Sequence, residues 1–147
     1  MESGWLLPDL SSEVTRGFWE GCAAGELRIQ TCADCGQMRM PPRPMCPACR
    51  SIARDWTVVS GRGRIWSFVV PHPPLLPAYA EIAPYAVATV ELVEDPSLRI
   101  VGALVAGPGP DMKTVRLESV EIGDEVEVAF IEVEDVTLPC WASTKWI

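Results

Sequence analysis

The sequence is poor in histidine, in basic residues and in long apolar runs, and each scarcity excludes a class of protein. It has one histidine, and its 12 basic residues against 20 acidic ones give a formal net charge of −8. A negative surface opposes nonspecific binding to nucleic-acid phosphates. No apolar run reaches the roughly 18 residues that a bilayer-spanning helix needs, and the first residues lack the pattern of a secretory signal. We therefore expect a cytoplasmic protein without a membrane span.

Cysteine, by contrast, is present in an informative pattern. Four of the six cysteines form two C-x-x-C pairs, Cys32/Cys35 and Cys46/Cys49, with ten residues between the pairs. Each pair directs two thiolates to one point, and two pairs supply the four ligands of a tetrahedral site with Zn–S bonds of about 2.3 Å. We predict a structural Zn²⁺ site, because four sulfurs leave no position for substrate. Rubredoxin-type iron is the alternative that this spacing does not separate from zinc.

Hydrophobic periodicity predicts one helix followed by strands. Ser11 and Ser12 suit the N-cap of a helix over residues 12–24, and Gly25 suits its end. Beyond the cysteines, five segments have the composition and alternation of strands. They are residues 56–60, 64–70, 85–93, 98–105 and 125–133. Five strands in a chain of this size favour a small closed barrel of the OB-fold type.

Two connections in this region are rich in turn residues. The segment from Pro71 to Pro84 carries five prolines and is expected to form a long ordered loop. The segment Gly107–Pro110 is expected to form a turn between the fourth and fifth strands. The only histidine, His72, lies in the proline-rich loop, and no Ser–His–Asp or Cys–His order is readable around it. We therefore predict no catalytic residue in this chain.

Positive charge is concentrated near the cysteines. Residues 39–64 contain six arginines and one acidic residue, a local charge of +5 within an acidic protein. Arginine suits bidentate recognition of phosphate or carboxylate groups. The cluster is therefore a candidate contact for a ligand phosphate or an acidic partner, with a solvated surface as the alternative for any single arginine.

Taken in order, the motifs resemble the acyl-CoA-associated zinc-ribbon/OB-fold family, which was first described as a domain of unknown function. The resemblance extends from about residue 12 to residue 142. It rests on Cys32-x-x-Cys35-Gly36, Pro41-Pro42-Arg43, Cys46-Pro47-x-Cys49, Trp66-Ser67-Phe68, Pro84-Tyr85-x-Val87-Ala88 and Ile122-Gly123-Asp124-x-Val126. It implies a mainly β fold with three parts. These are an N-terminal helical segment (1–25), a rubredoxin-like zinc ribbon (26–54) and a C-terminal five-stranded OB-fold barrel (55–147).

The resemblance also implies a function. Members of the family are usually not catalysts: they bind thiolase-superfamily enzymes, and some are fused to or paired with acyl-CoA hydratases. One branch links acetoacetyl-CoA thiolase to hydroxymethylglutaryl-CoA synthase, and another partners a lipid-transfer-protein-type aldolase that shortens steroid side chains by a retro-aldol step. We therefore expect a non-catalytic accessory subunit that binds and activates a thiolase-fold partner, such as a steroid side-chain aldolase, and helps to position acyl-CoA.

In that role, certain residues become candidate contacts. The phosphates of CoA suit Arg43, Arg62 and Arg64, whereas Trp66 and Tyr79 could pack on pantetheine or on the partner. His72 would act only at the mouth of a partner's active site.

Two functions of other classes stay open. A zinc-ribbon/OB module can bind single-stranded nucleic acid, which the basic stretch permits and the net charge opposes. A rubredoxin-like electron carrier would use the same four cysteines to hold iron.

Overall fold

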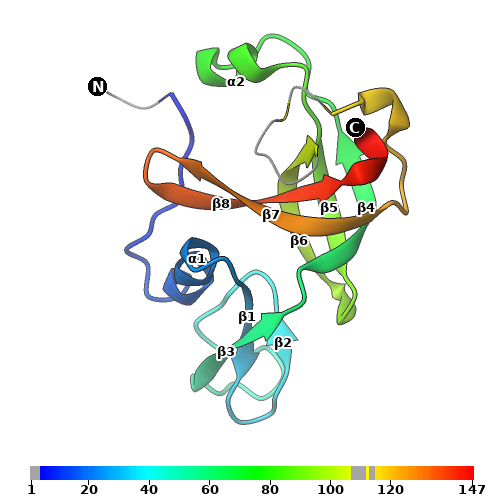
Figure 1. The fold of residues 1–147 in the computed structure, drawn as a ribbon. Coiled ribbons are helices and arrows are strands. Elements are labelled where there is room, and N and C mark those ends of the chain that lie inside the picture. The colour runs from blue at the N-terminus through cyan, green and yellow to red at the C-terminus, as the bar shows by residue number, and fades with distance from the viewer. Residues whose placement is uncertain (1–3, 107–111, 113–114) are drawn as a thin grey trace.

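The computed structural model describes residues 4–106, 112 and 115–147 and contains two β-sheets and a short N-terminal helix (Figure 1). A three-stranded sheet lies below a closed five-stranded barrel. Two short 3₁₀ turns follow the sixth and the eighth strand. The helices and strands are, in chain order, α1 (Arg16–Ala23), β1 (Leu27–Cys32), β2 (Met38–Arg39), β3 (Arg54–Val59), β4 (Arg62–Val69), α2 (Pro77–Ile82), β5 (Val87–Leu92), β6 (Asp95–Ala106), β7 (Glu125–Val133) and β8 (Val136–Ser143).

The N-terminal helix is shorter than the predicted span of residues 12–24. It begins at Arg16, after Thr15 as the N-cap residue, so the prediction of Ser11 and Ser12 as N-caps was wrong. Ser11 belongs to a separate turn. There the Asp9 carboxylate accepts hydrogen bonds from the backbone N–H and the hydroxyl of Ser11, at 2.9 and 2.6 Å. The predicted end is confirmed, since Gly25 adopts a φ of +77°, a conformation that favours glycine.

The small sheet has the strand order β2-β1-β3. Its third strand, β3, is the first of the five strands that the sequence predicted for the barrel, and its assignment to the barrel was wrong. β3 pairs antiparallel with the whole of β1, from Leu27 opposite Val59 to Cys32 opposite Arg54. The ring of Trp56 lies directly against Gly17 of α1, which leaves no room there for a larger residue. Packing against the helix therefore accompanies the pairing of this strand with β1.

The barrel closes in the order β4-β5-β6-β8-β7, so the predicted count of five strands and the OB-type barrel are correct. The fifth member is β8, which sequence periodicity missed. β8 pairs antiparallel with β7 and parallel with β6. Pro139 lies inside this strand, opposite Phe130, and a proline lowers the strand signal because it cannot donate to the ladder.

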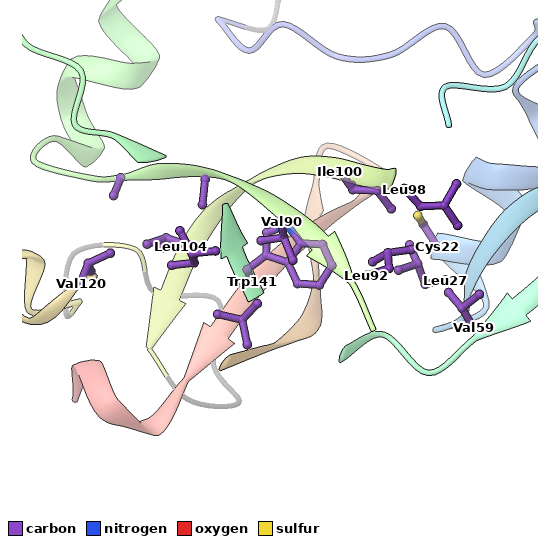
Figure 2. Close-up of a cluster of buried hydrophobic side chains, with 14 of the residues drawn as sticks. Cys22, Leu27, Val59, Val90, Leu92, Leu98, Ile100, Leu104, Val120 and Trp141 are labelled. Atoms are coloured by element: carbon purple, nitrogen blue, oxygen red, sulfur yellow. The ribbon is translucent and has the colours of Figure 1, made fainter. Parts of the chain in front are cut away.

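One hydrophobic core connects the small sheet to the barrel. Figure 2 shows Cys22, Leu27 and Val59 continuing into the barrel core around Val90 and Trp141. Trp141 and Val90 are fully buried. The small sheet therefore shares its packing with the barrel, and the described residues give it no separate core of comparable size. The predicted domain limits at residues 25 and 54 stay predictions.

The proline-rich segment is not a pure loop. It contains the single-turn helix α2, with Pro77 in its first turn, where the missing N–H of proline costs no helical hydrogen bond. The predicted turn at 107–110 lies outside the described residues. None of the helices in the described part of the chain is long and apolar enough to span a membrane.

Candidate functional site

The two C-x-x-C turns bring four thiols to one point at the end of the small sheet. All four sulfur atoms lie within 4.8 Å of one another. The Sγ atoms of Cys32 and Cys49 are 3.5 Å apart, and those of Cys35 and Cys46 are 3.6 Å apart. Ligands at the corners of a zinc tetrahedron are separated by about 3.8 Å when each Zn–S bond is about 2.3 Å. The four predicted ligands therefore have the arrangement of a four-coordinate metal site.

The same backbone turn forms both halves of the site. The N–H of Gly36 donates to the carbonyl of Cys32, and the N–H of Arg50 donates to the carbonyl of Cys46, both at 2.9 Å. Gly36 and Arg50 also share a left-handed conformation, with φ of +78° and +65°. Glycine adopts this conformation without strain, whereas arginine has a Cβ that opposes it. The second turn is therefore the more strained of the two.

Backbone donors stabilise thiolates within the cluster. The N–H of Cys35, 3.4 Å from the Cys32 sulfur, lowers the pKa of Cys32 to about 6. A hydrogen bond from the N–H of Cys49 likewise lowers the pKa of Cys46. Thiolates are the form that coordinates a metal ion. The turns thus prepare two of the four sulfurs for a cation, and the set of four sulfur donors suits a soft or borderline ion.

The predicted basic cluster is divided by the fold. Arg39 is only 6% exposed, so it is part of the interior and does not contribute to a basic face. Its guanidinium donates from Nε to Oε1 of Gln30 at 2.6 Å and from Nη2 to the carbonyl of Arg43 at 3.3 Å. The N–H of Arg43 donates to the same Gln30 oxygen at 2.7 Å. These bonds fix the backbone of Arg43, whose side chain remains exposed.

Arg62 and Arg64 lie together on β4 and line a cavity of about 780 Å³. Glu125 and Glu127 of β7 line the same cavity and pair across the strands with Arg64 and Arg62, respectively. Arg43 does not line it. The two arginines therefore belong to a surface of mixed charge, which suits a protein partner with both charge signs better than a polyanion.

The remaining candidates lie further along the exposed face of β4 or beyond this strand. Trp66 is 48% exposed, and the guanidinium of Arg99 lies 4.0 Å from the centre of its ring. Tyr79, on α2, accepts a hydrogen bond from the N–H of Leu6 at 3.0 Å. His72 is exposed and makes no hydrogen bond or ion pair within the described part of the chain. No orienting partner for this histidine is therefore found among these residues.

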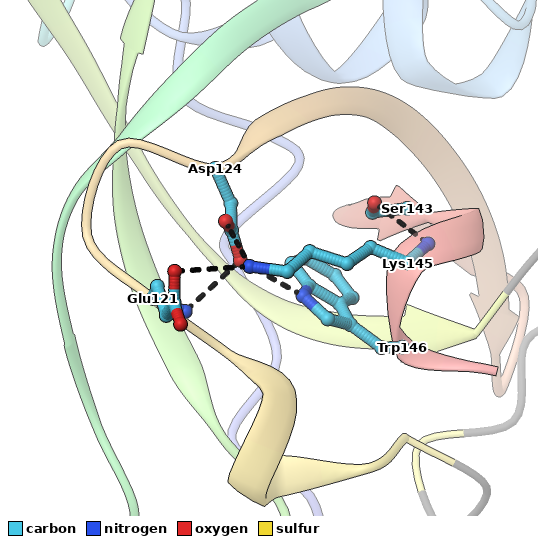
Figure 3. Close-up of polar contacts among 5 residues, drawn as sticks. All are labelled: Glu121, Asp124, Ser143, Lys145 and Trp146. Atoms are coloured by element: carbon cyan, nitrogen blue, oxygen red, sulfur yellow. Dashed lines mark hydrogen bonds and ion pairs between the residues drawn. The ribbon is translucent and has the colours of Figure 1, made fainter.

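Sequence reasoning missed a polar cluster around Asp124, shown in Figure 3. The Asp124 carboxylate accepts hydrogen bonds from Lys145 Nζ at 2.6 Å, from Trp146 Nε1 at 3.1 Å and from the N–H of Glu121 at 2.9 Å. Burial of Asp124 opposes its ionisation, but these donors outweigh it and lower the pKa of the carboxyl. The Gly-Asp motif was visible in the sequence, whereas its partner 21 residues further along the chain was not. This cluster fixes the C-terminal segment to the turn before β7.

Comparisons with known proteins agree with these features. Residues 19–51 match a family model described as "ChsH2, rubredoxin-like zinc ribbon domain", and residues 56–130 match one described as "ChsH2, C-terminal OB-fold domain". A solved structure described as "Ltp2-ChsH2(DUF35) aldolase" is 34% identical, with a TM-score of 0.76, and the match covers 92% of this chain and 98% of that one.

Two curated relatives extend the comparison. A "DUF35 domain-containing scaffold protein" of Methanothermobacter thermautotrophicus is 39% identical, over 71% of each chain. A "3-oxo-4,17-pregnadiene-20-carboxyl-CoA hydratase alpha subunit" of Mycobacterium tuberculosis is also 39% identical, over 89% of this chain but 38% of its own length. The chain thus spans about two fifths of the hydratase subunit that it matches.

Proposed function

The chain belongs to the ChsH2 (DUF35) family of zinc-ribbon/OB-fold proteins, and on that premise we propose that it is a non-catalytic accessory subunit of an enzyme complex. Its partner would be a thiolase-fold aldolase that acts on a CoA thioester. The observation that carries this proposal is the similarity to the chain of the Ltp2-ChsH2(DUF35) aldolase, which extends over nearly the whole of both chains.

The substrate of the complex would be a steroid CoA thioester, whose side chain the partner shortens by a retro-aldol step. The names of the aldolase and of the pregnadiene-carboxyl-CoA hydratase subunit support this substrate class. An acyl-CoA hydratase is accordingly a second candidate partner. The carbon–carbon bond would be broken by the partner's residues, since the exposed His72 has no orienting partner among the described residues.

The four cysteines, we propose, hold a structural Zn²⁺ ion. Cys32 is the last residue of β1 and Cys35 follows it, whereas Cys46 and Cys49 lie in the loop before β3. When bound, the ion would supply four bonds that tie this loop to the end of β1, with no coordination site left for substrate. Metal analysis of the purified protein tests this assignment: one colourless zinc ion per chain supports it, and red ferric iron would favour electron transfer.

We further propose that the chain contacts its partner through the exposed surface of β4. Trp66 supplies apolar area there, and Arg62 and Arg64 supply charge beside two glutamates. Buried tryptophan and arginine side chains carry a large share of binding energy at protein interfaces. Arg43, His72 and Tyr79 are the remaining candidate contacts for CoA or for the partner.

Coexpression with the aldolase encoded in the same organism tests the function. We expect the aldolase to be insoluble or inactive alone and active with this chain, as measured by release of the shortened CoA thioester. Trp66→Ala should weaken co-purification, whereas Ile122→Ala, a change at a 68% exposed residue in the turn before β7, should not. Full aldolase activity without this chain would refute the proposal.

The second candidate function, a nucleic-acid-binding module, is opposed by the distribution of charge. The burial of Arg39 removes one charge from the basic stretch, and two glutamates accompany Arg62 and Arg64. Both features weaken the electrostatic attraction to a phosphate backbone. Retention of single-stranded DNA by the protein at low salt would restore this alternative.

A further inference from the structure

A second cavity differs from the glutamate-lined one in its lining. It has a volume of about 650 Å³ and lies between the outer face of β5 and β6, the β7–β8 hairpin, the two helices and the N-terminal segment. Figure 1 shows that segment running from α1 past the hairpin tip towards α2. Trp5 packs edge-on against Tyr79 of α2, with ring centres 4.9 Å apart. This contact joins two of the walls.

The lining is apolar except at a few positions. Aromatic rings come from α1 (Phe18, Trp19), from α2 (Tyr79) and from the segment just before β5 (Tyr85), and aliphatic side chains form most of the remaining lining. Arg99 is the one charged residue among those that line the cavity, in a protein whose net charge is −8. No acidic side chain lines it, and Arg99 forms no ion pair with any residue that the structure describes. The Arg99 guanidinium lies 4.0 Å from the centre of the Trp66 ring and opposite Glu91 across the strands, so the edge of the cavity carries a positive charge that no ion pair within the described residues neutralises.

A second polar group lies deeper in the cavity. Tyr85 is only 7% exposed, and it lines the same cavity as Arg99. Burial, together with the neighbouring Tyr79, raises the pKa of Tyr85, which keeps the hydroxyl protonated and able to donate.

The two polar groups lie near opposite ends of this cavity. Arg99 pairs across the strands with Glu91, and Tyr85 precedes Glu91 by six residues along the same segment. At about 3.3 Å per residue for an extended chain, the two backbone positions are at most about 20 Å apart. An elongated molecule with an anionic group at one end and an oxygen at the other would therefore match both.

We propose that this cavity binds an anionic amphiphile: a carboxylate attached to a fused-ring or long acyl body. The apolar body fills the cavity, the carboxylate pairs with the Arg99 guanidinium, and Tyr85 donates a hydrogen bond to an oxygen at the far end. The volume lies within the range of about 300–1,000 Å³ that is typical of small-molecule sites. This site belongs to the chain itself and goes beyond the proposed docking function, because it needs no aldolase partner.

Binding of two probes to the isolated full-length chain tests the proposal. Cholate represents fused-ring carboxylates and palmitate represents acyl carboxylates, and each is titrated below its micellar concentration by calorimetry. We expect saturable binding of one molecule per chain for at least one probe. The methyl ester of the same probe should bind about tenfold more weakly, since it lacks the charge. Absence of saturable binding for both probes would overturn the proposal.

Matched variants locate the site. Val101→Trp places a large ring in the cavity from a 61% exposed position, and Val58→Trp makes the same change at a 57% exposed position outside it. We expect the first to reduce affinity at least about tenfold and the second less than about twofold. Equal affinities in the two variants would place the bound probe elsewhere and refute the site.

The polar groups are tested separately. Arg99→Gln should weaken the acid about tenfold and leave the methyl ester unchanged, and Tyr85→Phe should weaken a probe that carries a ring oxygen more than one that lacks it. These measurements use no partner, so they can fail while aldolase activation succeeds. Likewise, the probes can bind while aldolase activation fails, so the two proposals can be refuted separately.

Discussion

The cysteine-bearing loop of the small sheet and the barrel are each stabilised by a different kind of interaction. The small sheet has three strands, one of only two residues, and the loop that carries Cys46 and Cys49 has mostly exposed side chains. The barrel instead closes around fully buried side chains such as Trp141, Val90 and Leu104. The loop of the small sheet thus depends on four sulfur atoms meeting at a point, whereas the barrel, with the strands of the small sheet that share its core, depends on apolar area removed from water. The comparison indicates that the two regions respond to different perturbations.

Loss of a metal ligand should give the largest difference in hydrogen-exchange protection between the two regions. With Cys46→Ser, or after chelation, we expect the loop of residues 40–53 to lose its order while the barrel stays folded. Metal binding contributes about 10–16 kcal/mol in isolated zinc-finger peptides, which sets the upper scale of the effect. Hydrogen exchange should show lost protection around the loop and retained protection in β5 and β6.

Cys140→Ala is the control for this change, because Cys140 is a buried barrel cysteine that does not belong to the cluster of four. It should keep one metal ion per chain. Equal loss of protection in both regions after chelation would show that the shared core makes them a single cooperative unit.

Truncation of a buried side chain in the barrel core should instead destabilise the barrel. Trp141 is fully buried, and Trp141→Ala should reduce the free energy of unfolding by about 3–5 kcal/mol. Trp141→Phe should cost less, since the indole N–H has no hydrogen-bond partner among the described residues. Chemical denaturation with the metal bound measures both variants. If Trp66→Ala, at a half-exposed position, destabilises the protein as much as Trp141→Ala, the assignment of the core is wrong.

The Asp124 cluster should give an intermediate effect that depends on pH. Asp124→Asn leaves Lys145 without a carboxylate partner and should cost about 1–3 kcal/mol at neutral pH. Because the pKa of Asp124 is lower in the folded than in the unfolded state, its stabilisation is present above about pH 4 and is lost as the pH falls through the folded-state pKa. The variant should therefore show a flatter acid limb in a plot of stability against pH. Asp55→Asn, on exposed β3, should keep the steep limb.

The smallest expected effect is a difference in stability between substitutions in the two turns of the metal site. Arg50→Gly should relieve strain at a φ of +65° and stabilise the metal-bound form by up to about 1 kcal/mol. Gly36→Ala, at a φ of +78°, should destabilise it by about 1–2 kcal/mol. The chelator concentration that removes half the metal measures both shifts. Changes of the same sign would contradict the difference in strain.

The sequence predicted features that depend on local order. The cysteine spacing and the end of α1 at Gly25 follow from residues that are close along the chain, whereas the count of five barrel strands was right only because the misassigned β3 offset the missed β8. The place of β8 in the barrel could not be predicted in this way, because a strand with an internal proline is recognisable only from its partners β6 and β7. The burial of Arg39 was also invisible, since an arginine is expected at the surface until its hydrogen bonds to Gln30 and to the loop are known.

The position of β8 in the chain has a consequence for folding. This strand follows every other barrel strand, and it pairs with both β6 and β7. Until it arrives, those two strands present unpaired edges, and the position that Trp141 later fills stays open to water. Exposed edges of this kind favour association with other chains. The interval before β8 docks is therefore when a newly made chain is most exposed to aggregation, and a partner that binds early would shorten that interval.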